Sequence, residues 1–172
     1  IPDRRREPAV LGGFSRRRSR RSVQGEQFAL IFGRRGAGAE HRAGLARLAV
    51  QHDLVVLTDE VYEYLTFDGV AHRPLATFEG MAERTLSISS SGKSFSTTGW
   101  KIGWVCGPAP LVAAVRAAKQ FLTYVGGAPF QPAVAYALRH EMPWVADLRD
   151  SLQGKRDRLC AGLAAAGFGV CR

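Results

Sequence analysis

The stretch SSSGKSFSTTGWKIGW, residues 89–104, sets two lysines, Lys93 and Lys101, among hydroxyl side chains and glycines. The whole chain has only four lysines against twenty arginines, so arginine supplies most of its positive charge. An amine that must lose its proton to react cannot be replaced by a guanidinium group, which stays charged. The stretch therefore indicates chemistry carried out by a lysine amine.

A phosphate-binding P-loop is the main rival interpretation of Gly92-Lys93-Ser94. That motif requires a glycine at position 87, where serine stands. It also requires a helix directly after the lysine and serine, whereas the sequence continues with STTG, which is poor helix material. Both departures argue against a P-loop.

A neutral lysine amine forms a Schiff base with an aldehyde once desolvation or a neighbouring cation destabilises its ammonium form. Lys101 supplies such a cation and is also suited to binding a phosphate, as is the hydroxyl of Ser90. Gly92 lets the backbone approach a planar ring closely. A cofactor that carries both an aldehyde and a phosphate suits these groups together, and it is pyridoxal 5′-phosphate (PLP).

PLP also needs a carboxylate beside its ring nitrogen, which keeps that nitrogen protonated. Asp59 comes directly after LVVLT, residues 54–58, an apolar run that predicts a strand buried on both faces of a parallel sheet. Open α/β sheets bind ligands at such strand ends. Tyr62 follows three residues later and can donate a hydrogen bond to the ring oxygen. Taken alone, Asp59 is more often a turn-forming acid and Tyr62 more often a packed aromatic, so both assignments depend on Lys93.

The remaining pattern alternates strands and helices, which predicts an α/β layered fold with a mostly parallel sheet and flanking helices. A helix is expected over residues 40–51, and further strands at 84–90 and 102–107. Three more helices are expected over 111–124, over 132–140 and from Pro143 onward, since proline favours a first helical turn. Residues 168–172, FGVCR, look like the start of a further strand.

The net charge of +9 is concentrated at one end, because residues 1–36 contain ten arginines and three acidic residues. We expect this arginine-rich segment to be disordered, since it has few large apolar residues. Arginine clusters attract polyphosphates, which leaves a nucleic-acid-binding arm as an alternative. No aromatic residues interleave with the arginines and no recognition helix follows, so a solvated tail is favoured over a nucleic-acid partner.

Other classes of protein find little support in the composition. Three cysteines without a CxxC pair do not form a disulfide framework, and the four histidines show no metal-ligand spacing. No apolar run reaches the length of a membrane span, and the N-terminus lacks the apolar core of a signal peptide. We therefore expect no metal and no membrane partner, and a cytoplasmic location.

Two longer stretches, LTDEVYEYLTFDG at 57–69 and SISSSGKSFSTTGWKIGW at 87–104, resemble the class I PLP-dependent aminotransferases of fold type I. The segments GWKIGWVCGPAPL and YVGGAPFQPAVA further resemble the branch that contains the N-succinyldiaminopimelate and kynurenine aminotransferases. The resemblance covers about residues 43–170. It implies the large, PLP-binding domain of such an enzyme, and a reaction that moves an amino group from an amino acid to a 2-oxo acid.

The resemblance also implies roles for individual residues. Lys93 would form the Schiff base and shuttle the proton, Asp59 would pair with the pyridinium nitrogen, and Tyr62 would bond the ring oxygen. Ser90 and Lys101 match the family's phosphate ligands. Residues 124–130 correspond to a loop that lies near the neighbouring subunit's active site in the family, so a homodimer is expected of the parent enzyme.

Several departures from the family pattern lower the expected activity. The NPTG-like turn that precedes the aspartate in the family is absent, and the chain has no asparagine at all. The earlier half of the large domain and the small domain, with its substrate-binding arginine, are also missing. We therefore expect an incomplete aminotransferase with impaired activity, with a non-catalytic fragment as the alternative.

The predicted organisation has three parts. Residues 1–38 form a basic segment that is disordered or derives from a shifted reading frame, residues 39–165 form the partial PLP-binding domain, and residues 166–172 begin the small domain.

Overall fold

The computed structural model describes residues 14–15, 27–32, 39–123 and 126–170, which group into two compact units. The first unit takes the described residues up to Glu60 together with Arg73–Ser89 and 104–123. The second takes Val61–His72, Ser90–Gly103 and 126–170.

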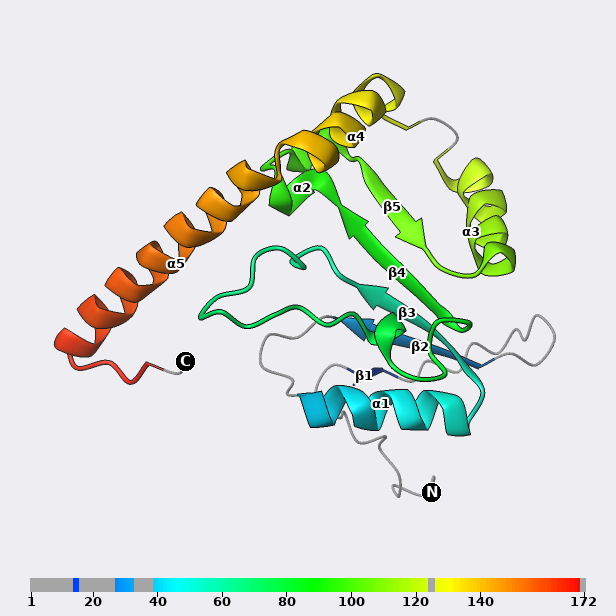
Figure 1. Cartoon of the computed structure of the whole chain (residues 1–172), viewed down its shortest axis with the longest axis horizontal. Helices are drawn as coiled ribbons and strands as arrows, with labels where there is room; N and C mark the ends of the chain where they lie inside the picture. The colour runs from blue at the N-terminus through cyan, green and yellow to red at the C-terminus, as the bar shows by residue number, and fades with distance from the viewer. Residues whose placement is uncertain (1–13, 16–26, 33–38, 124–125, 171–172) are drawn as a thin grey trace, which may run out of the picture. The chain divides into compact units, whose positions relative to one another are not determined.

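A five-stranded sheet in the order β1-β2-β3-β4-β5 forms the centre of the first unit (Figure 1). β1 pairs antiparallel with β2, whereas β2, β3 and β4 run parallel to one another. The arrows of β4 and β5 run in opposite directions, so the sheet is mixed (Figure 1). The predicted strands at 54–58, 84–90 and 102–107 are confirmed. The strands are Phe14–Ser15, Gln27–Phe32, Leu54–Asp59, Thr85–Ser90 and Gly103–Cys106.

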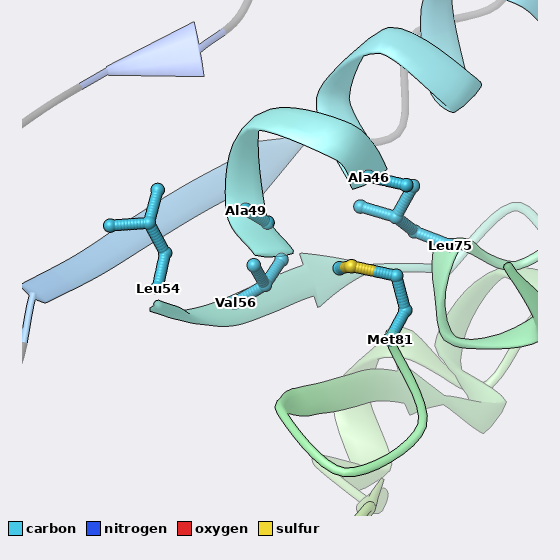
Figure 2. Packing of buried hydrophobic residues seen from close by; sticks show 6 residues of the cluster. All are labelled: Ala46, Ala49, Leu54, Val56, Leu75 and Met81. Carbon is cyan, nitrogen blue, oxygen red and sulfur yellow. The ribbon is translucent and has the colours of Figure 1, made fainter. Parts of the chain in front are cut away.

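Helix α1, Ala39–Gln51, connects the parallel strands β2 and β3 and lies against the sheet, as predicted for residues 40–51 (Figure 1). Its small residues Ala46 and Ala49 pack onto β3, where Leu54 and Val56 are almost fully buried (Figure 2). Small alanine side chains let the helix approach the strand closely, and the apolar contact stabilises both elements. Leu75 and Met81 complete this hydrophobic cluster.

Burial alternates along β3, with Leu54, Val56 and Thr58 buried and the residues between them half-buried. The prediction that this strand is buried on both faces is therefore wrong for the chain as described. Only the face toward α1 is fully covered, because the hydrophobic cluster that includes Ala46, Ala49 and Met81 packs on that face.

Gln27–Phe32 form β2 and pair with the whole of β3, although they lie within residues 1–38, for which disorder or a shifted reading frame was expected. Phe14–Ser15 also belong to the sheet. The other residues of 1–38 lie outside the described ranges, and the three-part division of the chain stays a prediction.

Helix α3, Ala109–Leu122, confirms the helix predicted over 111–124 as far as Leu122, but its apolar stripe is not buried. Phe121 and Leu122 are 89% and 82% exposed. Periodicity predicts that a helix has an apolar face, whereas a partner element must be present to bury that face.

The second unit is built from short elements and two longer helices. α4 spans Gln131–His140 and α5 spans Met142–Ala165, both with a proline in the first turn, as predicted for Pro143. The strand expected at 168–172 is absent from its described residues, 168–170. The short elements are η1 Leu75–Thr77 in the first unit and α2 Ser91–Ser94, η2 Thr98–Trp100 and η3 Ala128–Phe130 in the second.

None of the helices in the described ranges combines the length and apolarity needed to cross a bilayer.

Candidate active site

Lys93 lies on α2, a single helical turn that begins directly where β4 ends. Ser90 is both the last residue of β4 and the N-cap of α2, with an extended backbone. The Lys93 side chain is exposed, and it makes no hydrogen bond or ion pair with any described residue. The chain thus presents a primary amine that is open to a ligand.

The structure brings Tyr62 next to this amine. The Nζ atom of Lys93 lies 5.9 Å from the centre of the Tyr62 ring, within the range of a cation–π interaction. Tyr62 is 48% exposed, so its ring faces solvent beside the lysine. The predicted proximity of a phenol to the lysine amine is present.

The loop that carries Tyr62 is held against α5 by a bidentate ion pair. Arg156 donates hydrogen bonds of 2.6 Å to both carboxylate oxygens of Asp68, and Asp68 N donates to Gln153 Oε1 at 2.7 Å. The Arg156 guanidinium also lies 5.1 Å from the centre of the Phe67 ring. The hydrogen bonds to Asp68 and Asp157 raise the pKa of Arg156, and the paired hydrogen bonds fix the guanidinium against the Asp68 carboxylate.

The two predicted phosphate ligands, Ser90 and Lys101, flank one backbone hydrogen bond. Ser91 N donates to Ile102 O at 3.1 Å. Ser90 directly precedes Ser91 and Lys101 directly precedes Ile102, so the two predicted ligands lie on adjacent segments. Lys101 has left-handed backbone angles, φ 57° and ψ 37°. Residues other than glycine rarely adopt this conformation, and such strain concentrates at functional sites. The exposed Lys101 side chain has no hydrogen bond or ion pair with any described residue.

Asp59 ends β3 in the first unit, where it pairs with Phe32 of β2 and Ile88 of β4. Ile88 is two residues before Ser90 on the same strand. Asp59 is thus at the carboxyl end of a parallel strand, as predicted, and its side chain is half-buried. Its action together with Lys93 stays a prediction.

Sequence reasoning missed the two threonines that follow the lysine. Thr97 Oγ1 lies 2.9 Å from Ser91 Oγ and 3.1 Å from Ser91 O, and Thr98 Oγ1 donates to Gly92 O at 3.0 Å. The density of hydroxyls in STTG was the available signal. It did not reveal that the two threonine hydroxyls bond to Ser91 and to the backbone of Gly92 in α2.

The loop at 126–130 packs against the segment that carries Lys101. Trp100 stacks on Phe130 with ring centres 4.6 Å apart, and a Cβ at Gly127 would lie 2.8 Å from Ile102 Cδ1 and 3.0 Å from Trp100 O. Only glycine allows so close an approach, which explains the glycine at this position. Tyr124, at the start of the predicted partner-facing loop, lies outside the described residues.

Ser91 and Ser94, both fully buried on α2, provide a matched pair of substitutions. Ser91 Oγ donates to Ile102 O at 3.3 Å, whereas Ser94 Oγ has no hydrogen-bond partner among the described residues. Losing a hydrogen bond costs about 1 kcal/mol, and a buried unpaired hydroxyl costs about 1–3 kcal/mol. We therefore expect Ser91→Ala to lower the free energy of unfolding and Ser94→Ala to leave it unchanged or raise it.

Urea unfolding of the two variants measures this difference. A loss of about 1 kcal/mol or more in Ser94→Ala would show that its hydroxyl has a partner, and would contradict the packing described for α2.

The groups around α2 fit a ligand with an aldehyde and a phosphate. An open amine is present at Lys93, and a second amine at Lys101 and a hydroxyl at Ser90 suit a phosphate. A Cβ at Gly92 would lie 3.4 Å from both Ser90 Oγ and Thr98 Cα, so glycine suits the close packing of this turn. Within the described ranges no group of three or more His, Cys, Asp or Glu side chains could hold a metal.

Comparison with known proteins identifies the family of the chain. The family model for class I and II aminotransferases matches residues 39–172. A probable N-succinyldiaminopimelate aminotransferase of Mycobacterium tuberculosis is 64% identical over 132 residues, which cover 77% of this chain and 33% of that protein. A kynurenine–oxoglutarate transaminase of Dictyostelium discoideum is 43% identical over 130 residues, 72% of this chain and 29% of that protein.

Solved structures give the same result. The N-succinyldiaminopimelate aminotransferase of M. tuberculosis superposes with a TM-score of 0.79 at 58% identity, over 83% of this chain and 38% of that chain. An aspartate aminotransferase double mutant of Thermus thermophilus superposes with a TM-score of 0.73 at 30% identity, over 81% of this chain and 38% of that chain. The predicted fold type I is confirmed, and the chain spans about a third of the length of the curated relatives it matches. The chain belongs to the class I and II aminotransferase family.

Proposed function

We propose that the protein transfers an amino group from an amino acid to a 2-oxo acid with PLP as its cofactor. The observation that carries this proposal is the Lys93 amine, which is open on a single helical turn at the end of β4 with the Tyr62 ring 5.9 Å away. Class I and II aminotransferases are generally PLP-dependent, which supports the choice of cofactor.

Bound PLP supplies an aldehyde that condenses with amines and a ring that withdraws electrons from the bond being broken. The Lys93 amine would hold the cofactor covalently and would act as the base that moves a proton at the reacting carbon. The carboxylate of Asp59 would hold a proton on the ring nitrogen. The Tyr62 phenol would donate a hydrogen bond to the ring oxygen, and Ser90 with Lys101 would bind the phosphate.

The relatives support one amino donor over another. Identity is 64% to the protein named for N-succinyldiaminopimelate and 43% to the one named for kynurenine. We therefore propose an amino acid of the N-succinyldiaminopimelate type as donor, with 2-oxoglutarate as a candidate acceptor. A homodimer is proposed for the active form. The alternative of a nucleic-acid-binding protein acting through residues 1–36 gains no support from the family match, which begins at residue 39.

Covalent labelling tests the proposal directly. The 172-residue chain is incubated with PLP, reduced with borohydride and digested, and the pyridoxyl group is located by mass spectrometry. We expect the label on Lys93 rather than on the other three lysines, Lys101, Lys119 and Lys155. Equal labelling of all four lysines, or none, would contradict the proposal. Amino transfer from N-succinyldiaminopimelate and from kynurenine to 2-oxoglutarate then ranks the donors.

A further inference from the structure

Helix α2 cannot be stable on its own, although it carries the proposed reactive lysine. It has four residues, and a single turn fixes several backbone angles for very few hydrogen bonds. Phe95 N donates to Ser91 O at 2.9 Å, and Ser96 N lies 3.4 Å from Lys93 O. Other contacts must therefore keep this turn, and the direction of the Lys93 side chain, in place.

The hydroxyls of Thr97 and Thr98 supply such contacts. Thr98 Oγ1 donates to Gly92 O at 3.0 Å, and Thr97 Oγ1 lies within hydrogen-bond distance of both Ser91 O and Ser91 Oγ. Ser91 and Gly92 are the two residues directly before Lys93. Both threonines thus fold back over the turn and hold the backbone from which the lysine projects.

The buried residue Ser91 connects these threonine contacts to the neighbouring segment at Ile102. Ser91 is fully buried, and its Oγ and N both donate to Ile102 O, at 3.3 and 3.1 Å. Thr97 can then donate its single hydroxyl proton to Ser91 Oγ. The result is a chain of hydrogen bonds from Thr97 through Ser91 to Ile102. Fully satisfied buried networks of this kind fix one conformation of the groups they join.

We propose that Thr97 and Thr98 are positioning residues for Lys93: their hydroxyls hold α2 so that the amine faces the side occupied by the Tyr62 ring. The inference rests on the proposed function of Lys93, and it adds that the lysine's reactivity depends on two side chains that act through the backbone of α2. A displacement of about 1 Å costs on the order of a hundredfold in a reaction that depends on alignment.

The test compares Thr97→Val and Thr98→Val, which remove the hydroxyl and keep the shape, with Thr97→Ser and Thr98→Ser, which keep the hydroxyl. The readout is the rate of borohydride-trapped PLP labelling at Lys93, relative to labelling at Lys119 and Lys155 in the same sample. We expect the valine variants to label Lys93 about tenfold or more slowly. The serine variants should remain near the wild-type rate.

Thr77→Val provides the matched control, because Thr77 Oγ1 also donates to a backbone carbonyl, Pro74 O, at 2.7 Å, on an element without proposed site residues. It should leave labelling of Lys93 unchanged. A purely structural role for Thr97 and Thr98 would change the melting temperature but not the selectivity for Lys93 over the other lysines.

Two further outcomes separate the proposals. If the wild-type chain labels Lys93 selectively and both valine variants label it at the same rate, the positioning role is wrong while the proposed function stands. If the wild-type chain shows no selectivity for Lys93, the proposed function itself fails. If Thr97→Val does not fold, Thr98→Val decides, since the Thr98 side chain is exposed.

Discussion

Lys93→Ala is expected to remove selective labelling by PLP and to lower the rate of amino transfer by about 10²- to 10⁴-fold, the usual contribution of a positioned acid–base group. The same change should hardly alter the free energy of unfolding. Lys93 is exposed and has no hydrogen bond or ion pair with a described residue, and surface substitutions of this kind stay within about 0.5 kcal/mol. A large loss of reactivity without a loss of stability would identify a chemical role.

Two matched variants sharpen this experiment. Lys119→Ala removes an exposed amine whose hydrogen-bond partner among the described residues is Thr123 Oγ1, so labelling of Lys93 should be unchanged. Lys101→Ala should leave the label on Lys93 but require more PLP for half-maximal labelling, because a phosphate contact is lost. A small primary amine added to Lys93→Ala should restore part of the amino transfer. Lys93→Ala that still labels selectively at another lysine would refute the assignment.

Much of the fold could be predicted because its signals are local. The run of apolar residues in β3 and the periodic apolar residues of α1 mark these elements within a few positions of their observed bounds. Strand β2 was missed, because the surrounding arginines dominate the composition of the segment in which QFALIF lies. Its pairing with all six residues of β3 is a non-local contact that average composition does not reveal.

The exposed apolar faces show a second limit. The spacing of apolar residues correctly predicted α3 and α5, yet Phe121, Leu122 and Leu159 are largely exposed in the chain as described. Periodicity is a property of one segment, whereas burial depends on a second segment that packs against it.

The candidate site was predictable to the extent that it depends on residue type. A lysine, a phenol and a strand-end carboxylate could be named because each supplies a distinct chemical group, and the structure brings Lys93 and Tyr62 together. The hydrogen bonds from Thr97 and Thr98 to α2 could not be predicted. They depend on a turn in which Ser96 and Lys101 adopt positive φ angles, and these residues are not glycines that would mark such angles in the sequence.

Met81→Ala is expected to give the largest loss of stability in the first unit. The Met81 side chain is fully buried and lies against Val56 in the cluster between α1 and β3 (Figure 2). Removing a buried methionine side chain leaves a cavity, at a cost of about 2–5 kcal/mol. Thermal unfolding followed by circular dichroism should show a fall in melting temperature on the order of 10 °C.

The chain's other methionine provides the control, since Met142 is only half-buried in the first turn of α5. Met142→Ala should cost clearly less than Met81→Ala, and Met81→Leu, which nearly conserves volume, should cost less than about 1.5 kcal/mol. Equal losses in the two alanine variants would mean that the cluster is not packed as described. Because β3 also ends at Asp59, a loosened cluster should weaken PLP labelling of Lys93 in Met81→Ala more than in Met142→Ala if Asp59 takes part in binding the cofactor.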